Sequence, residues 1–204
     1  MAPSMVERCV RRNPIYLGKS VNFRVDEVRL PNGRRAIREY MDHPGAVAVA
    51  PFLDPDTILL VRQYRYPVGR LTYEIPAGKL DGEESPLRCA LRELREETGY
   101  RAGRIRSLLS FWPAPAFSNE RLHIYVADRL VRGRQSLDED EFLEIQTVPF
   151  QKALSWVLSG KIQDSKTIIA LLHCAHTRNR RRTCASRPSR GDAVRRSRSD
   201  RRRK

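Results

Sequence analysis

The order of hydrophobic and polar residues in the first third of the chain predicts β-strands. Apolar residues alternate in part over 21–30, and after the turn signal Pro31-Asn32-Gly33 a second strand can return over 34–41, as in a β-hairpin. Residues 1–15 show no clear period, and we expect a loose leader there. A two-stranded hairpin is at best marginally stable alone, so we expect it to pack on another part of the protein.

The rest of the chain has the pattern of further strands with one central helix and two later helices. His43-Pro44-Gly45 breaks the pattern and is a candidate domain junction. Strands are predicted at 46–53, 57–63, 71–75, 105–112, 122–127 and 142–148. Later helices are predicted over 149–159 and after Asp164, through Ile168, Ile169, Leu171 and Leu172. This order predicts an α+β fold, a sandwich built on a mixed sheet.

The central helix has clear start and stop signals. Ser85 suits the N-cap, Pro86 the first helical position, and Gly99 the position just past the end. Residues three and four apart share a helix face. One face is therefore apolar and the neighbouring face acidic, formed by Leu87, Ala90, Leu91 and Leu94 and by Glu93, Glu96 and Glu97 respectively.

The charge of the chain lies mostly at its C-terminal end. Residues 177–204 hold thirteen Lys or Arg and two Asp, a net +11 of the total +15. So polar a segment cannot bury enough surface to order itself, and we expect a disordered tail. Nucleic acid is the partner that such a tail could bind, in a strongly salt-dependent way. An unselected extension or an altered reading frame are the alternatives.

The body of the chain has the composition of a soluble protein. No apolar run approaches the length that spans a bilayer, and the first residues lack the apolar core of a signal peptide. We therefore expect a cytoplasmic protein that does not enter the membrane. Cys9, Cys89, Cys174 and Cys184 are scattered, which indicates neither a disulfide framework nor a zinc site.

The three glutamates on one helix face repel one another, and a cation would relieve this repulsion. Mg²⁺ prefers carboxylate oxygens, keeps several waters and bridges to phosphates. A solvated acidic face, paired with the arginines between the glutamates, is the alternative interpretation. Spacing decides between the two. The stretch from Gly78 to Tyr100 resembles the signature of the Nudix hydrolases, G-x5-E-x7-R-E-U-x-E-E-x-G-U, where U is a bulky apolar residue.

All seven fixed positions of that signature match, which chance would give on the order of 10⁻⁹ times per start position. They are Gly78, Glu84, Arg92, Glu93, Glu96, Glu97 and Gly99. Leu94 fits the first apolar position, and Tyr100 is aromatic where an aliphatic residue is more usual. The resemblance implies an α/β/α sandwich and a hydrolase that uses Mg²⁺, with Mn²⁺ as the alternative, on a nucleoside diphosphate linked to another group.

By the same resemblance, Glu93 and Glu97 are the most favoured metal ligands and Glu96 is the next. The carbonyl of Ala77 is a further ligand in related enzymes. Arg92 would orient the glutamates rather than touch metal.

The flanking residues are similar to the ADP-ribose pyrophosphatase branch, which implies a homodimer through a small N-terminal sheet. The residues expected to bind substrate are Arg62, Arg65, Glu74, Pro115 and Phe117. Arg62 and Arg65 lie near the end of a strand leading toward the site, where an Arg fork suits a diphosphate, and surface arginines are the alternative. Phe117 or Tyr64 could stack on a base, with packing in the core or in a loop as the alternative. Pro115 is the usual distinguishing mark of this branch, and Ala116 stands where the branch more often has Gly.

The base that activates water is assigned to the acidic loop over 137–142. The resemblance favours Glu139 as base, with Glu141 as a metal ligand or alternative base. A solvated acidic loop without a catalytic role is the alternative interpretation. We therefore expect a β-rich dimerisation segment at 1–44, a hydrolase domain at 45–176 and an Arg-rich tail at 177–204. The expected reaction is hydrolysis of ADP-ribose to AMP and ribose 5-phosphate. GDP-sugars, other ADP-sugars or dinucleotides are alternative substrates, and a nucleic-acid-binding or regulatory protein is the alternative of another class.

Overall fold

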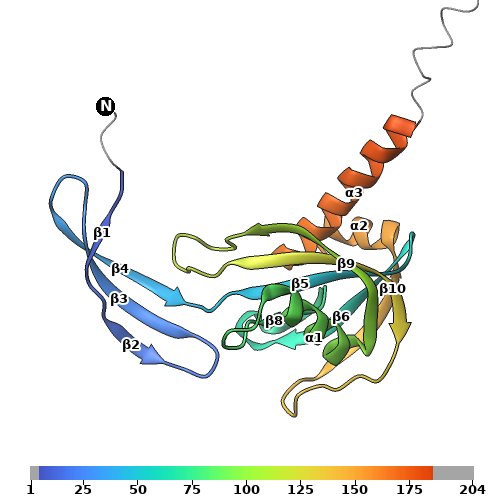
Figure 1. The fold of residues 1–204 in the computed structure, drawn as a ribbon, viewed down its shortest axis with the longest axis horizontal. Coiled ribbons are helices and arrows are strands. Elements are labelled where there is room, and N and C mark those ends of the chain that lie inside the picture. The colour runs from blue at the N-terminus through green and yellow to red at the C-terminus, as the bar shows by residue number, and fades with distance from the viewer. Residues whose placement is uncertain (1–4, 186–204) are drawn as a thin grey trace, which may run out of the picture.

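The computed structural model describes residues 5–185 of the chain, and side chains as far as residue 178. Its first part is a four-stranded sheet that stands apart from the body (Figure 1). The predicted hairpin is present as β3 (Asn22–Arg29) and β4 (Arg35–Asp42), which pair antiparallel over their whole length. Gly33 makes the turn with φ of 83°, a conformation that glycine adopts without strain.

The prediction of a loose leader over 1–15 was wrong for its second half. Residues there form β1 (Arg8–Arg11) and β2 (Pro14–Leu17), which pair one after the other along the same edge of β3. Every side chain of these two strands is exposed. Because neither face is buried, no alternation of apolar residues is required. Backbone pairing holds the strands, and the Asn13 N–H donates to the buried Asp26 carboxylate at 2.8 Å.

The body is built on a mixed sheet of seven strands, in the order β11-β6-β5-β10-β9, with β7 on β6 and β8 on β5. Only β5 and β10 pair in parallel. The strands are β5 (Ala46–Asp54), β6 (Thr57–Arg65), β7 (Arg70–Glu74), β8 (Ala77–Lys79), β9 (Tyr100–Phe111), β10 (Leu122–Arg132) and β11 (Leu143–Pro149). The 3-10 helix η1 (Tyr66–Val68) joins β6 to β7.

Strand β9 begins five residues earlier than predicted, and β10 ends five residues later than predicted. Their extra residues pair with each other as a two-stranded ribbon, from Tyr100 opposite Arg132 to Arg104 opposite Asp128. Ala102 and Leu130 pack against the core beside the central helix, but most other side chains of this ribbon are polar, so too few apolar residues mark it as strand in the sequence.

Helices cover both faces of the sheet, as the expected sandwich requires. Alternate residues of β5 point to opposite sides. Val47 and Val49 pack with α1 (Pro86–Thr98). Ala48 and Phe52 belong to the core beneath α2 (Phe150–Leu158) and α3 (Ser165–Ala185) (Figure 1).

The predicted bounds and caps of α1 are confirmed. The Ser85 hydroxyl accepts from the Arg88 N–H, Pro86 is the first residue, and Gly99 ends the helix with φ of 74°. Among residues 5–185, no helix is long and apolar enough to cross a membrane.

The last helix continues past Thr177, where disorder was predicted. Helix α3 runs to Ala185 and projects from the body (Figure 1). Arginine and alanine favour helix even where they bury little, and the Arg178 guanidinium lies 4.3 Å from the ring centres of Phe52 and Phe150. The rest of the expected tail, residues 186–204, lies outside the described residues.

The two central strands separate next to α1, and this separation makes room for a site. Strands β5 and β6 pair only near their hairpin, at Phe52 with Ile58 and Asp54 with Thr57. Beyond that point β6 pairs with β7 and β5 with β8. The short crossing from β7 to β8 is fixed by the Val49 N–H, which donates to the Pro76 carbonyl at 2.9 Å.

A buried carboxylate lies at the end of β7. Glu74 is 2% exposed, and Arg65 binds both its oxygens, with Nε 2.8 Å from Oε1 and Nη2 2.7 Å from Oε2. The Thr72 hydroxyl donates to Oε1 at 2.6 Å, and Lys166 Nζ donates to Oε2. Burial alone raises the pKa of Glu74, but Arg65 and Lys166 outweigh it and lower the pKa to about 2.

Replacing Glu74 by Gln tests this cluster through the pH dependence of stability. The folded pKa lies below the ordinary value of 4.5. The carboxylate therefore stabilises the fold above pH 4.5, and this contribution is lost as the pH falls toward 2. We expect Glu74→Gln to lower the free energy of unfolding at pH 7 by about 3 kcal/mol. We also expect it to flatten the decline in stability between pH 4.5 and 2.

Urea unfolding at a series of pH values measures both effects. Glu144→Gln is the control, because Glu144 is an exposed partner of Arg62 and such pairs contribute at most about 1 kcal/mol. The same acid dependence in Glu74→Gln and in the unaltered protein would contradict the role given to Glu74.

Candidate active site

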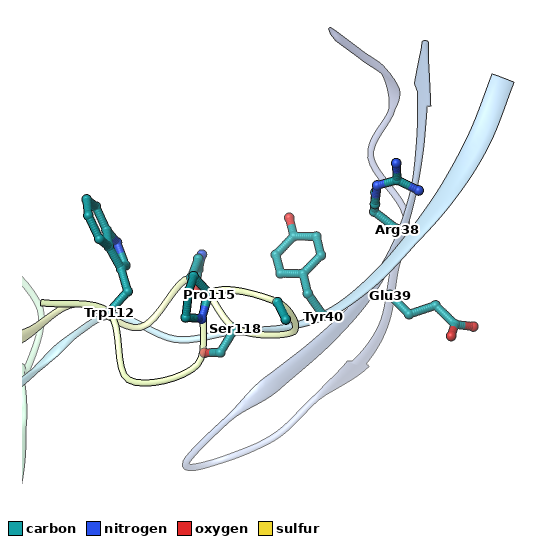
Figure 2. Close-up of a pocket in the computed structure, with 8 residues that line it drawn as sticks. Arg38, Glu39, Tyr40, Trp112, Pro115 and Ser118 are labelled. Carbon is teal, nitrogen blue, oxygen red and sulfur yellow. The ribbon is translucent and has the colours of Figure 1, made fainter. Parts of the chain in front are cut away.

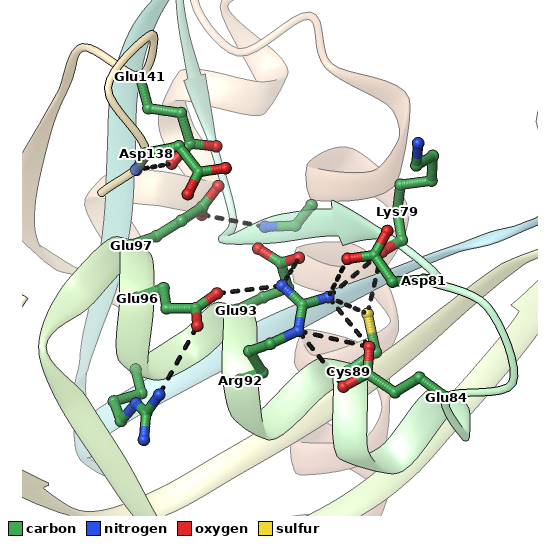
Figure 3. A network of polar contacts seen from close by, with 12 residues as sticks. Lys79, Asp81, Glu84, Cys89, Arg92, Glu93, Glu96, Glu97, Asp138 and Glu141 are labelled. Atoms are coloured by element: carbon green, nitrogen blue, oxygen red, sulfur yellow. Dashed lines mark hydrogen bonds and ion pairs between the residues drawn. The ribbon is translucent and has the colours of Figure 1, made fainter. Parts of the chain in front are cut away.

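Glu93 and Glu97 lie on the buried side of α1, facing β8 (Figure 3). They are 8% and 3% exposed, whereas the Glu96 side chain retains 27%. The four-residue spacing of Glu93 and Glu97 puts both on one face. The helix thus presents two buried carboxylates and one partly buried carboxylate to the start of β8.

Gly78 lets the backbone of β8 approach this face closely. A Cβ atom at this position would lie 1.9 Å from Glu93 Oε1, so no larger residue fits without displacing the carboxylate. The next contact along the strand is a hydrogen bond from the Ala77 N–H to Glu97 Oε2 at 3.1 Å. The backbone of Ala77 and Gly78 therefore lines the same space as the two buried glutamates.

Arg92 binds three of the carboxylates around it (Figure 3). Its Nη1 lies 2.7 Å from Glu93 Oε1 and 3.0 Å from Glu96 Oε2, and its Nη2 lies 3.0 Å from Glu84 Oε2. The hydrogen bond to Glu84, followed by the neighbouring glutamate charges, raises the pKa of Arg92. This guanidinium orients the glutamates from the side away from Glu97.

The two buried glutamates carry charge that the protein only partly compensates. Burial raises the pKa of Glu93 to about 7, against the opposing effect of Arg92. Burial and then the charge of Glu93 raise the pKa of Glu97 to about 8, against the hydrogen bond from the Ala77 N–H. Carboxylates that are costly to ionise when alone are stabilised by a cation between them.

The donors at this face are oxygen atoms, which suits a hard divalent cation. Within residues 5–185, no three His, Cys, Asp or Glu side chains are arranged so that they could hold a metal ion. In this arrangement the carboxylates pair with Arg92 and the Ala77 N–H instead. The oxygen donors suit such an ion, while the ligand set predicted at Ala77, Glu93, Glu96 and Glu97 stays a prediction.

The acidic loop between β10 and β11 begins against the end of α1. Gln135 Nε2 donates to the Glu97 carbonyl at 2.6 Å, and the Ser136 N–H donates to the Glu96 carbonyl at 3.0 Å. The Gly133 N–H donates to the Gly99 carbonyl at 2.7 Å. These bonds tie the first half of the loop to the helix and direct the second half over the site.

Of the two candidate bases in this loop, the structure brings Glu141 to the glutamates of α1. The charge of Glu141 raises the pKa of both Glu93 and Glu97, and Figure 3 shows it together with Asp138 beside Glu97. Glu139 is not among the main causes of either shift. The assignment of Glu139 as base stays a prediction.

The arginines predicted to bind substrate have different surroundings. Arg65 is bound to the buried Glu74, which raises its pKa, and the charge of Glu97 adds to the rise. Arg62 instead pairs with Glu144 on β11 at 3.1 Å. Glu74 has its oxygens occupied by Arg65, Thr72 and Lys166, so its role as a substrate-binding residue stays a prediction.

Pro115 belongs to a separate cavity, where the loop after β9 meets the N-terminal sheet (Figure 2). This cavity has a volume of 450 Å³ and none of the glutamates of α1 lines it; its walls are Arg38, Glu39, Tyr40, Trp112, Pro115, Ala116, Ser118 and Asn119. Phe117 is 57% exposed, and its carbonyl accepts from the Met41 N–H at 2.8 Å. This cavity therefore does not join Pro115 to the glutamates of α1.

Sequence reasoning did not find Gln135 or Lys166 as parts of this region. Gln135 acts through a backbone carbonyl, which leaves no pattern in the sequence. Lys166 reaches Glu74 from a helix that begins about ninety residues later in the chain. A lysine at the start of an apolar helix gives no signal of a buried ion pair.

Comparison with known proteins agrees with this geometry. The family model described as the NUDIX domain matches residues 42–172. The chain is 41% identical over 170 residues to an ADP-ribose pyrophosphatase of Bacillus subtilis (strain 168), covering 82% of this chain and 92% of the relative. It is 42% identical over 167 residues to a methanol dehydrogenase activator of Bacillus methanolicus, covering 81% and 90%.

A third relative is an ADP-ribose pyrophosphatase of Mycobacterium tuberculosis (strain ATCC 25618 / H37Rv), 37% identical over 161 residues, or 78% of each chain. Among solved structures, a crystal structure of an ADP compounds hydrolase matches with a TM-score of 0.74 and 22% identity, over 85% of this chain and 95% of that chain. The structural match shows the same fold. Together with the complete glutamate motif on α1, these matches show that the chain belongs to the Nudix family.

Proposed function

We propose that this protein hydrolyses the diphosphate of ADP-ribose to AMP and ribose 5-phosphate, with Mg²⁺ as the metal. The observation that carries the proposal is the pair of buried carboxylates, Glu93 and Glu97, held against the glycine backbone of β8. The names of two relatives, both ADP-ribose pyrophosphatases, support the choice of substrate. The exposed edge of Arg65 supports a diphosphate as the group that is recognised.

In this proposal Glu93, Glu97, Glu96 and the Ala77 carbonyl hold Mg²⁺. When bound, the ion neutralises diphosphate charge and lowers the pKa of a water. The residues of the chain do the rest. Arg65 binds a diphosphate oxygen, Arg92 keeps Glu93 and Glu96 in place, and the acidic loop supplies a carboxylate.

The reaction itself is a displacement at phosphorus. A water oxygen forms a bond to one phosphorus of the diphosphate, and the bond from that phosphorus to the bridging oxygen breaks. The proton of the water passes to a loop carboxylate, Glu139 in the first instance. The bridging oxygen leaves with the other phosphate, so the products are AMP and ribose 5-phosphate.

A substrate panel tests the proposed activity. We expect purified protein with Mg²⁺ to convert ADP-ribose to AMP with a higher kcat/KM than it shows for a GDP-sugar, another ADP-sugar or a dinucleotide. Product analysis by chromatography distinguishes AMP plus ribose 5-phosphate from other cleavage positions. Rapid turnover of the GDP-sugar with none of ADP-ribose would contradict the substrate assignment and leave the metal site untouched.

Two loop variants test which glutamate is the base. We expect Glu139→Gln to lower kcat by about 10²–10⁴-fold, the usual contribution of a general base, with little change in the Mg²⁺ concentration that gives half-maximal rate. We expect Glu141→Gln to raise that Mg²⁺ concentration, because Glu141 acts on Glu93 and Glu97 electrostatically. Asp140→Asn is the matched control, because Asp140 faces Lys19 in an exposed pair. A large loss of kcat in Glu141→Gln, together with a raised Mg²⁺ requirement in Glu139→Gln, would contradict this assignment and make Glu141 the base.

We also propose that the N-terminal sheet, within residues 1–44, mediates a homodimer. Supporting this are the apolar side chains that the sheet leaves exposed, among them Ile15, Tyr16, Leu17 and Ile37. Exposed apolar patches on a sheet favour burial against another surface. The mass from sedimentation equilibrium distinguishes dimer from monomer, and a monomer at all concentrations would contradict the proposal.

A further inference from the structure

The first turn of α3 lies against β7 and the crossing from β7 to β8, where Lys166, Thr167 and the preceding Asp164 form hydrogen bonds. Lys166 Nζ donates to Glu74 Oε2 and, at 2.8 Å, to Asp164 Oδ1. The Thr167 hydroxyl is fully buried, donates to Asp164 and accepts from the Ile75 N–H at 2.9 Å. None of these residues belongs to the glutamate motif, and the proposed reaction does not use them.

We propose that Lys166 is a positioning residue for Arg65: it fixes Glu74 so that the Arg65 guanidinium presents its unused edge to the substrate diphosphate. This inference rests on the proposed function, because it gives Arg65 a diphosphate to bind. It assigns a part in the reaction to a helix on the opposite face of the sheet from α1.

The geometry of Glu74 makes Lys166 necessary for this arrangement. The carboxylate accepts four hydrogen bonds, two from Arg65, one from Thr72 and one from Lys166. The Lys166 side chain is 13% exposed and that of Glu74 is 3% exposed. Buried ion pairs hold a defined geometry only when each charge has its partners. Without Lys166, Glu74 loses one of its two cations and is free to follow Arg65 in other orientations.

The geometry of Arg65 shows what Lys166 would hold in place. Its Nε and Nη2 both donate to Glu74, whereas no other described residue accepts a hydrogen bond from Nη1. The side chain is 43% exposed, and the charge of Glu97 acts on it. The guanidinium therefore has one edge bound to Glu74 and keeps Nη1 available for a further acceptor. An arginine side chain whose guanidinium is already held in place loses less conformational entropy when it binds a phosphate oxygen.

The same turn of α3 also holds the backbone of the crossing from β7 to β8. Thr167 accepts from the N–H of Ile75, two residues before Ala77. The Ala77 N–H in turn donates to Glu97. The first turn of α3 thus supports both the substrate arginine and the strand crossing, and Lys166 carries the part that concerns the arginine.

Removal of the lysine charge should separate binding from chemistry. A diphosphate contact made equally in the ground state and in the transition state changes KM and leaves kcat unchanged. We expect Lys166→Met to raise KM for ADP-ribose by about 10-fold, with kcat within about 3-fold of the unaltered protein. We expect Lys166→Arg, which keeps a cation beside Glu74, to restore KM to within about 3-fold.

The matched control is Lys161→Met. Lys161 lies 3.7 Å from the ring centre of Trp156 and 4.8 Å from that of Tyr73, so it packs against the same strand without touching Glu74. We expect its KM to be unchanged. Lys166→Gln is a second neutral variant, in case the Met variant does not fold, and thermal melting by circular dichroism shows which variants are folded.

A double substitution tests whether Lys166 acts through Glu74. In a Glu74→Gln background, the further change Lys166→Met should leave KM unaltered, because the group that it positions has already lost its charge. A second, multiplicative rise in KM would contradict action through Glu74. Turnover by the unaltered protein together with an unchanged KM in both Lys166→Met and Lys166→Gln would overturn the positioning role alone. No turnover of ADP-ribose by the unaltered protein would contradict the proposed function and, with it, this inference.

Discussion

The burial of the Glu93 and Glu97 carboxylates against the backbone of β8 is the constraint on which the rest of the site depends. Two like charges at this depth are unfavourable, as their raised pKa values show. The fold keeps them there by specific means. Gly78 leaves out the Cβ that would strike Glu93, Arg92 binds one side of the cluster, and the Ala77 N–H binds the other. Two buried carboxylates that repel each other form a site that a bound cation would stabilise.

The architecture around the site follows from holding this helix and this strand together. Strands β5 and β6 separate beyond their hairpin, and β8 lies along β5 where α1 can reach it. The opposite face of the sheet is closed by α2 and α3 (Figure 1). From that face the first turn of α3 reaches through to Glu74 and Ile75. Both helical layers therefore contribute to a site that the motif alone places on one helix.

The sequence predicted those parts of the molecule whose local signals agree with their tertiary surroundings. Ser85, Pro86 and Gly99 define α1 because capping is local chemistry, and the packing of the helix agrees with it. Strands β1 and β2 escaped prediction because neither face is buried, so no alternation is required. The extension of α3 to Ala185 was not predicted, because its low hydrophobicity indicates disorder whereas its arginines favour helix.

The site itself was predictable only where residues lie close in sequence. The glutamates of α1 share a helical face, which spacing alone reveals. Glu74 was predicted to bind substrate, but its oxygens are occupied by Arg65, Thr72 and Lys166, a fact that depends on a helix distant in sequence. The position of Glu141 near Glu97 belongs to a loop whose start is tied to α1 by Gln135. Such contacts between distant segments leave no local pattern.

Thermal unfolding with and without Mg²⁺, in the absence of substrate, tests the central claim most directly. Saturating Mg²⁺ should raise the unfolding midpoint of the unaltered protein by on the order of 5 °C, since a ligand at 100 times its Kd adds about 2.7 kcal/mol. The shift should vanish in Glu97→Gln and persist in Glu144→Gln, whose carboxylate lies outside the site. An equal shift in all three proteins, or none in the unaltered protein, would contradict a metal site formed by the buried glutamates.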